Sequence, residues 1–519
     1  MPRDFFHDRH AGLLVPLFSI PSRTSWGIGE LSDLPALGAW LSDAGFSFVQ
    51  LLPLNEMAGG QNSPYSALSA MAIDPIFIAP SGVPDIEALG GEAVLDERER
   101  RQLEAARRAP TIDYGQVRAL KTKAFRAGFA RFLEVEWRAT TPRARRLQRF
   151  TERARWWLDA YAIFRALHAR YEGRAWTEWE PALRDRSPAA LAQAQAELGE
   201  EVLFYAYLQW LAAEQWAQAR EAAEVGVFGD FPFMVSGDSA DVWSRQEDFR
   251  MDASVGAPPD AFSETGQDWG FPAYRWDRVA AGGFQWLAAR ARRNAELYDA
   301  YRVDHLVGFF RTYVRETDGR AGFVPGDEPA QVRQGERVLE VLSAAGARLI
   351  AEDLGVIPGF VRDALLRLGI PGFKVLRWER DWDREGQPFR DPGRYPAVSV
   401  ATSGTHDTEP NAQWWDEAPI EERRAAVAVL GEGLRDPDAP FDERIRDAIL
   451  DTLFLSGSDI ALVPIHDVFG WRERINTPAL VSDANWTWRL PWPVDALQAH
   501  PMAAERAVYL RELIARSRR

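Results

Sequence analysis

Residues 301–310 read YRVDHLVGFF, and this run predicts a short buried strand that carries two charges. Most of its positions are apolar residues of high strand propensity. Arg302 and Asp304 are two residues apart, so on a strand their side chains point to the same face. A neighbouring guanidinium keeps a carboxylate ionised and oriented, as a nucleophilic aspartate requires. A purely structural ion pair at a strand end is the alternative interpretation.

Apolar runs with strand character recur along the chain on both sides of residues 301–310. They occupy residues 12–18, 48–54, 226–233, 348–355, 372–378, 397–402 and 460–465. Helical patterns separate most of them, at residues 34–44, 335–346, 359–369, 420–435 and 442–456. Eight strands alternating with helices predict an α/β fold, a (β/α)₈ TIM barrel with its chemistry at the strand carboxyl ends. A doubly wound sheet is the competing fold, but no G-x-G-x-x-G motif follows the first strand.

A long segment interrupts this rhythm between the second and third strands. Residues 85–222 are mostly polar and helical in pattern, with apolar stripes at helical spacing. The stripes are Trp157, Tyr161, Phe164 and Leu167, then Phe204, Leu208 and Leu211. Such stripes are typical of core packing. We therefore expect barrel strands 1–2 in residues 1–84, a mainly helical inserted subdomain in 85–222, and strands 3–8 with further loop insertions in 223–519.

The composition of the chain excludes several kinds of chemistry and argues against several kinds of partner. The net charge of −15 over 519 residues argues against nucleic acid and against anionic membrane surfaces. Cysteine is absent, which excludes disulfides and thiolate chemistry. The chain shows neither an apolar leader nor an apolar run of membrane-spanning length, so we expect a cytoplasmic protein. The 21 tryptophans belong mostly to core packing, although flat rings that stack on sugars would also explain a surplus.

Charged and histidine residues follow five of the eight predicted strands. They are Asp230, Asp304-His305, Glu352-Asp353, His406-Asp407 and His466-Asp467. Any one acid could be a helix N-cap or a solvated loop charge. Because the carboxyl ends of barrel strands meet at one face, the set instead predicts a catalytic site. Neither a histidine pair at helical spacing nor an acidic calcium loop is present, so we expect no metal and no cofactor.

Three acids beside arginine and histidine fit glycosidic bond chemistry. Retaining cleavage needs one ionised carboxylate and one carboxyl group that is protonated at rest. Asp304, beside Arg302, suits the nucleophile. Glu352 follows an apolar tripeptide, which favours a raised pKa and the role of acid. Asp407 then remains as a fixed negative charge that stabilises the transition state.

Nine motifs, taken in order, resemble those of the amylomaltases, the 4-α-glucanotransferases of glycoside hydrolase family 77. They are NSPYS (62–66), DSADVW (238–243), PPD (258–260), GQDWG (266–270), RVDH (302–305), AEDLG (351–355), GTHD (404–407), RINTP (474–478) and NWTWR (485–489). The resemblance covers residues 10–490 or so. It implies the same three catalytic roles for Asp304, Glu352 and Asp407. It further implies that Ser63, Tyr65, Asp260, Trp269, Arg302 and His406 contact sugar.

The sequence differs from the family pattern at three places. Val307 replaces a frequent arginine, Thr408-Glu409-Pro410 replaces Asn-Asp-Thr, and Ala479 replaces a glycine. These differences concern donor and acceptor preference rather than the reaction class. The resemblance implies transfer of α-1,4-glucan segments to the 4-hydroxyl of another glucan or of glucose, by a monomer or a homodimer. A glucan hydrolase with the same barrel and a non-catalytic glycan-binding relative are the alternatives.

Overall fold

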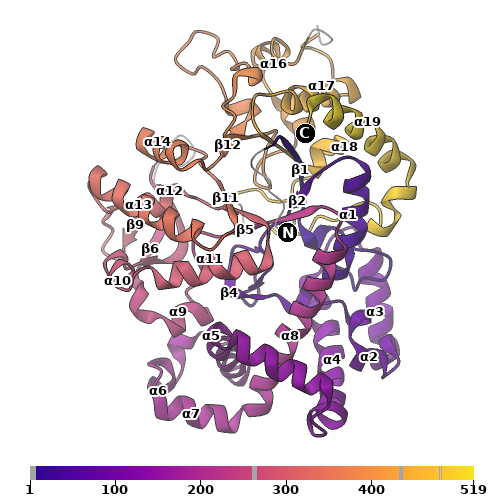
Figure 1. Ribbon diagram of the computed structural model, residues 1–519, viewed down its shortest axis with the longest axis vertical. Helices are drawn as coiled ribbons and strands as arrows, with labels where there is room; N and C mark the ends of the chain where they lie inside the picture. Colours follow the sequence, from indigo (N-terminus) through magenta and orange to yellow (C-terminus); the bar gives the residue numbers. More distant parts are fainter. Residues whose placement is uncertain (1–7, 260–265, 432–435, 479, 481) are drawn as a thin grey trace.

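Eight parallel strands close into a barrel in the computed structural model, which describes residues 8–259, 266–431, 436–478, 480 and 482–519 (Figure 1). The strands are β1 (His10–Leu14), β2 (Phe48–Gln50), β5 (Gly226–Phe231), β8 (Ala300–Val303), β11 (Arg348–Ala351), β12 (Gly372–Val375), β13 (Ser399–Thr402) and β14 (Ile460–Pro464). Around the barrel they follow the order β1-β14-β13-β12-β11-β8-β5-β2. Each lies within or beside one of the eight predicted runs, so the TIM-barrel prediction is confirmed.

Strand register explains why charged side chains appear at one end of an apolar barrel. Phe228 of β5 pairs with Ala300 of β8, and two residues later Asp230 pairs with Arg302. Phe228 also stacks on Phe48 of β2, with ring centroids 4.0 Å apart. Residues two apart on a strand share a face. The face that carries packed phenylalanines deep in the barrel therefore carries Asp230 and Arg302 at the carboxyl ends.

The helices between the strands agree with the predicted ranges at most positions. They include α1 (Leu34–Asp43), α13 (Glu328–Ser343), α14 (Gly359–Leu368), α16 (Ile420–Val427) and α17 (Glu443–Phe454). The prediction of one helix over 420–435 is wrong in length. Helix α16 ends at Val427, Gly431 has a φ of +94°, and residues 432–435 lie outside the described part of the chain. In the described ranges, no helix has the length and apolar character that crossing a membrane requires.

Between β2 and β5 the chain forms a short hairpin and then a group of helices on one side of the barrel (Figure 1). The hairpin consists of β3 (Asn55–Met57) and β4 (Ala67–Ile73). The long helices are α4 (Tyr114–Phe132), α5 (Pro142–Arg170) and α8 (Gly199–Ala222). Both predicted apolar stripes are buried, one on α5 and one on α8, and the two helices pack together. The division into subdomains remains a prediction.

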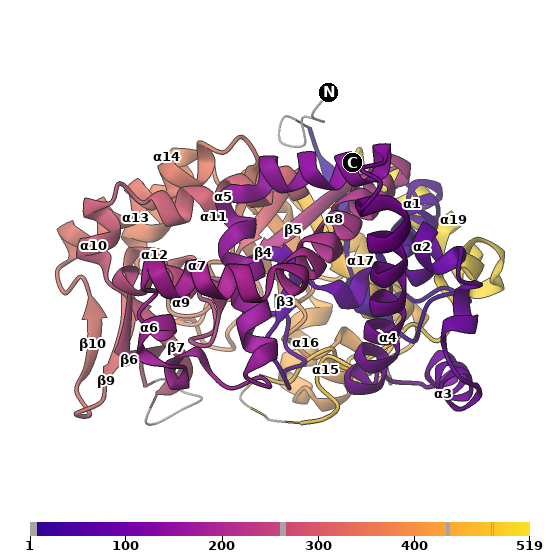
Figure 2. The same ribbon diagram turned by 90° about the horizontal axis from the view of Figure 1, so that it is seen from below.

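A second sheet, which the sequence analysis did not predict, extends beside the barrel (Figure 2). Its four antiparallel strands run in the order β10 (Ala321–Val324), β9 (Thr312–Glu316), β6 (Phe249–Ala257) and β7 (Gln267–Tyr274). Strands β6 and β7 come from the loop after β5, and β9 and β10 from the loop after β8. The sheet thus joins two loops that follow the neighbouring barrel strands β5 and β8.

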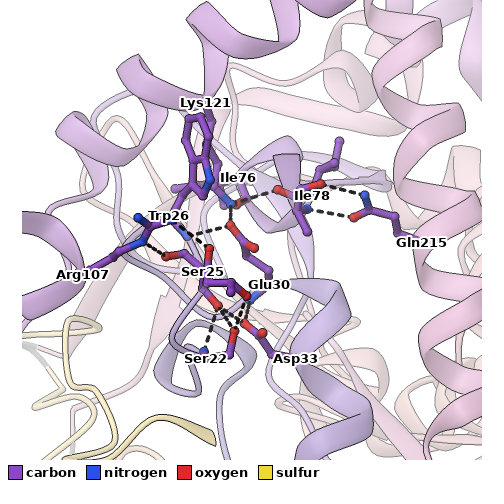
Figure 3. Close-up of polar contacts among 12 residues, drawn as sticks. Ser22, Ser25, Trp26, Glu30, Asp33, Ile76, Ile78, Arg107, Lys121 and Gln215 are labelled. Atoms are coloured by element: carbon purple, nitrogen blue, oxygen red, sulfur yellow. Dashed lines mark hydrogen bonds and ion pairs between the residues drawn. The ribbon is translucent and has the colours of Figure 1, made fainter. Parts of the chain in front are cut away.

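A buried ion pair joins the helical insertion to the barrel (Figure 3). Nζ of Lys121, on α4, lies 2.6 Å from Oε1 of Glu30, in the loop between β1 and α1. The same amine donates to the carbonyls of Ile76 and Ile78, and Trp26 N donates to Glu30. Burial raises the pKa of Glu30 to about 7 and lowers the pKa of Lys121. Removing either partner would leave the other charge buried and unpaired, which strongly destabilises a fold.

Candidate active site

The guanidinium of Arg302 contacts three acids at the carboxyl end of the barrel. Nη1 donates to both carboxylate oxygens of Asp230, at 3.0 and 2.8 Å. Nη2 lies 2.8 Å from Oδ1 of Asp304 and 4.0 Å from Oε2 of Glu352. The predicted pairing of Arg302 with Asp304 is therefore present in the structure. Both candidate catalytic carboxyl groups also lie within 4.0 Å of one nitrogen, so the same guanidinium faces both of them.

The predicted strand over residues 301–310 is wrong beyond Val303. Strand β8 ends there, residues 304–306 turn, and a short helix, α12 (Val307–Phe310), follows. His305 has a φ of +43°, in the left-handed region that is rare for non-glycine residues. In this conformation its backbone N–H donates to Oε2 of Glu352 at 2.8 Å. The turn thus brings the two candidate catalytic acids together, and backbone strain at such sites is common.

Glu352 has the environment of a carboxyl group that is protonated near neutral pH. Burial, reinforced by the Asp304 carboxylate, raises its pKa to about 7. Arg302 and two backbone donors lower the pKa of Glu352 but do not cancel this effect. The donors are the N–H groups of His305 and Leu354, at 2.8 and 3.0 Å. The raised pKa agrees with the predicted role of acid and base.

The environment of Asp407, in contrast to that of Glu352, favours the ionised carboxylate. Asn476 donates to its Oδ1 at 2.7 Å, and Nε2 of His406 lies 3.4 Å from its Oδ2. Burial alone would raise the pKa of Asp407, but His406, Asn476 and Arg302 together hold it well below its usual range. The carboxylate is thus ionised at neutral pH. A fixed negative charge is what a developing oxocarbenium ion requires nearby.

Tyr65, His406 and Trp486 form one aromatic side of the site. The ring of Tyr65 stacks on His406 with centroids 5.2 Å apart, and Trp486 lies within 5.8 Å of both rings. The Tyr65 hydroxyl donates to Oδ2 of Asp230 at 2.7 Å, which ties this side to Arg302. Ser63 accepts the Tyr65 backbone N–H at 3.3 Å and so shapes the loop that carries the ring.

Trp269 lies on β7 and reaches the site from the second sheet. Its ring meets His305 edge to face, with centroids 4.7 Å apart. Burial lowers the pKa of His305 to about 4, so this imidazole is neutral at physiological pH. The predicted contact residue Asp260 lies outside the described residues, as does Ala479. The sheet therefore positions a predicted sugar-binding tryptophan beside the catalytic turn.

Two arginines that the sequence analysis did not assign hold the loop that carries Asp407. Arg377 pairs with the carboxylate of Glu409 at 2.6 Å and donates to its backbone carbonyl. Arg474 donates to the carbonyl of Asp407 at 2.7 Å and lies 3.7 Å from Glu409. Glu409 therefore serves two arginines, at a position where the family pattern also has an acid. The RINTP motif already contained Arg474 and Asn476, but a motif does not show which loop its side chains reach.

Three other acids and histidines at the strand ends have different partners. Asp353 accepts the backbone N–H of Phe373 at 2.7 Å. Asp467 accepts from Ser403 and from the backbone of Asn411. His466 is buried against Trp488, with centroids 4.0 Å apart. These residues support the barrel rim, so the converging set is Asp230, Asp304, Glu352, His406 and Asp407.

The arrangement combines an ionised carboxylate beside arginine, a carboxyl group with a pKa near neutrality, and aromatic faces. Within the described parts of the chain, no group of three or more His, Cys, Asp or Glu side chains is placed to hold a metal ion. Double displacement at an acetal carbon needs one carboxylate nucleophile and one proton donor, and the environments of Asp304 and Glu352 suit these two roles.

Comparison with known proteins gives one consistent result. The family model described as 4-alpha-glucanotransferase, glycoside hydrolase family 77, matches residues 15–495. A 4-alpha-glucanotransferase from Thermus thermophilus is 34% identical over 512 residues, which cover 94% of this chain and 95% of the relative. One from Chlamydia pneumoniae is 32% identical over 509 residues, covering 94% and 93%. The solved amylomaltase from Streptococcus agalactiae in complex with acarbose superposes with a TM-score of 0.82 at 26% identity, covering 98% and 99% of the two chains.

Proposed function

Because the chain belongs to the 4-alpha-glucanotransferase family, glycoside hydrolase family 77, we propose that Asp304, Glu352 and Asp407 perform its reaction. The activity of the chain is the retaining transfer of α-1,4-glucan segments. The observation that supports the residue assignment is the position of Asp304 and Glu352 around one guanidinium. Their different electrostatic environments divide the two roles between them.

In the first half of the reaction, Asp304 attacks the anomeric carbon of the donor glucan. Glu352 gives its proton to the glycosidic oxygen, the bond to the leaving chain breaks, and a covalent glucosyl ester forms on Asp304. Asp407 stays ionised and stabilises the positive charge that develops on the sugar ring. Arg302 keeps the Asp304 carboxylate oriented before attack.

The second half reverses these steps with another glucan. Glu352, now ionised, removes the proton from the acceptor 4-hydroxyl, whose oxygen attacks the anomeric carbon. The ester bond breaks and Asp304 is regenerated, so the sugar configuration is retained. Glucose or an oligosaccharide serves equally as acceptor in this scheme.

Sugar contacts belong to the same proposal. The rings of Tyr65 and His406 lie beside Asp230 and Asp407, and Trp269 lies beside the turn that carries Asp304, so each can contact a sugar near the proposed catalytic acids. Ser63 shapes the Tyr65 loop, and Arg302 contacts the carboxylate of Asp304. Asp260 is proposed on the sequence motif alone. The state of assembly, monomer or homodimer, and the cytoplasmic location remain predictions.

Incubation with maltotriose tests the function. Transfer to sugar yields glucose together with a ladder of longer oligosaccharides, while the total of reducing ends stays constant. A steady rise in reducing ends without longer products would show that water takes the acceptor position. Chromatography of the products and a reducing-end assay on the same samples separate the two outcomes.

A further inference from the structure

The loop that carries Tyr65 belongs to an irregular hairpin. Strands β3 and β4 pair antiparallel, but their register shifts on both sides of Glu56. Shifts of this kind interrupt the ladder of backbone hydrogen bonds and re-aim side chains, and they are frequent beside active sites. Strand pairing alone therefore does not fix the connection, residues 58–66, on which Tyr65 lies.

The side chain of Glu56 joins this hairpin to helix α5. Glu56 is 3% exposed, and its Oε2 accepts the hydroxyl of Tyr161 at 2.5 Å. Nε of Arg165 lies 3.1 Å from Oε1 of the same carboxylate. Tyr161 and Arg165 are four residues apart on α5, so their side chains are neighbours on one face of the helix. One hydrogen bond and one ion pair from a single helix face thus hold both oxygens of the carboxylate.

Two further side chains connect the hairpin to helices α8 and α4. Gln209 of α8 accepts from and donates to the backbone of the last residue of β4, at 3.0 and 2.8 Å, and also donates to the Tyr161 hydroxyl at 3.3 Å. Asp74, which follows β4, accepts the Met57 N–H at 3.1 Å and two hydrogen bonds from Arg118 of α4, at 2.9 and 2.7 Å. Polar side chains from three helices therefore replace the regular pairing that the hairpin lacks.

A buried carboxylate is a poor way to stabilise the contact between a hairpin and a helix. The loss of hydration offsets much of the attraction between the charges, and packed apolar side chains of similar volume would stabilise the contact as well or better. A charged and hydrogen-bonded group instead fixes direction and distance, because its bonds tolerate little misalignment. The contacts of Glu56 are therefore explained better by placement of the hairpin than by stability.

The ring of Tyr65 depends on such placement. It stacks on His406 with centroids 5.2 Å apart, and its hydroxyl donates to Oδ2 of Asp230 at 2.7 Å. Asp230 in turn accepts from Arg302, the arginine that contacts Asp304. A shift of the hairpin against α5 would change the stacking and the hydrogen bond together, and both weaken steeply when the groups are misaligned.

We propose that Glu56, held by Tyr161 and Arg165, is a positioning residue that sets the Tyr65 ring in the active site. The inference rests on the proposed function, because the position of this ring affects the reaction only if Tyr65 contacts the sugar. Glu56 is buried and acts through the hairpin rather than on the substrate. By this route the helices that lie outside the barrel contribute to the rate of the reaction.

Tyr161→Phe tests the proposal, since it removes one donor to Glu56 and keeps the ring. We expect kcat/KM on maltotriose to fall about tenfold, because misplacement by about 1 Å, caused far from the chemistry, can cost up to about a hundredfold. Tyr205→Phe is the matched control. Its ring packs on the same Arg165, at 4.7 Å, but its hydroxyl is not among the groups that bind Glu56 in the described chain, so kcat/KM should stay within about twofold. An unchanged kcat/KM in Tyr161→Phe would overturn the proposal.

A double-mutant cycle separates positioning from a general loss of stability. If Tyr161 acts through Tyr65, Tyr161→Phe should have little further effect on kcat/KM once Tyr65→Ala has removed the ring. Additive losses in the two variants would contradict the proposal. Thermal unfolding of each variant shows that the assays are made on folded protein. Glu56→Gln keeps the volume of the side chain and loses its charge, so it repeats the cycle if Tyr161→Phe does not fold.

The outcomes distinguish this inference from the proposed function. If Tyr65→Ala keeps full activity, the sugar contact proposed for Tyr65 fails, and the positioning role fails with it. If Tyr65→Ala is impaired while Tyr161→Phe and Glu56→Gln match the wild type, only the positioning role fails. If the wild type makes no ladder from maltotriose, transfer itself is refuted, and the same cycle measured on glucose release still decides the role of Glu56.

Discussion

Nη2 of Arg302 and Oδ1 of Asp304 are 2.8 Å apart although Arg302 belongs to strand β8 and Asp304 to the turn after it. The arginine is fixed by the barrel, because its other nitrogen pairs with Asp230 on the neighbouring strand. The aspartate is carried by a turn with an unusual backbone at His305. The ion pair thus holds a strained turn in place on a rigid barrel, and the positions of both proposed catalytic acids, Asp304 and Glu352, depend on that turn.

Asp304→Asn should reduce turnover by at least about a thousandfold while the fold persists, because the variant keeps the shape of the nucleophile but loses its charge. Turnover of maltotriose and thermal unfolding measure the two effects. Asp353→Asn is a matched control, since Asp353 also follows a barrel strand but accepts the backbone N–H of Phe373 on the neighbouring strand. Retention of more than about a tenth of the activity in Asp304→Asn would remove Asp304 from its role.

The value of kcat/KM should fall as pH rises through about 7. Glu352 must be protonated to act as acid, and its pKa in the free enzyme is raised to about 7, so the acid form is lost above that pH. This loss forms the basic limb of the kcat/KM profile. Asp407, whose pKa is held well below its usual range, adds no limb to the profile near neutral pH.

Glu352→Gln should distinguish substrates by their leaving groups. A poor leaving group such as the hydroxyl of a glucan needs the proton from Glu352, whereas the fluoride of glucosyl fluoride leaves without it. The variant should therefore lose far more activity on maltotriose than on the fluoride in the first half-reaction. Similar losses on both substrates would assign the proton to another residue.

Asn476→Ala should lower kcat about tenfold with little change in KM, because it removes one hydrogen bond to a charged group. Without this donor the pKa of Asp407 rises and the carboxylate is less firmly oriented. Asn476→Asp should be more damaging, since it sets a second negative charge against Asp407. Full activity in Asn476→Ala would show that His406 and Arg302 suffice.

Lys121→Met should destabilise the protein by about 3–5 kcal/mol, the usual cost of leaving one partner of a buried ion pair alone. Denaturant unfolding measures the change. Lys123→Met, at an exposed position two residues away, is the control and should cost little. The double change Lys121→Met/Glu30→Gln should recover part of the stability, and failure to do so would argue that Glu30 does not carry the cost.

Much of the barrel could be predicted because its strands are continuous apolar runs, a pattern that parallel buried strands share. The sheet formed by β6, β7, β9 and β10 could not, since its strands are half exposed and one of its three pairs, β6 with β9, joins distant segments. Arg302, Asp304 and Glu352 lie at strand ends that the pattern locates. The turn at His305 was not predicted, because the apolar pattern continues through α12 and gives no sign that the strand ends there.

Supporting residues of the site were harder to find than the acids. Asn476 and Arg474 reach Asp407 from almost seventy positions away, and Glu409 meets Arg377 across a loop. Contacts of this kind depend on where loops pack, which local sequence does not specify. Asp353 shows the opposite error. It follows a barrel strand, as the candidate catalytic acids do, but its carboxylate contacts the neighbouring strand β12.

The buried position of Lys121 makes it a chemical probe of how the molecule opens. The chain has three lysines, at positions 121, 123 and 374, and the first two lie on the same helix. The side chain of Lys121 is 2% exposed and that of Lys123 is 43% exposed. An amine-directed reagent therefore modifies Lys123 in the intact protein but reaches Lys121 after α4 leaves the barrel. Mass spectrometry of a single peptide reads both amines, so one serves as the internal reference for the other.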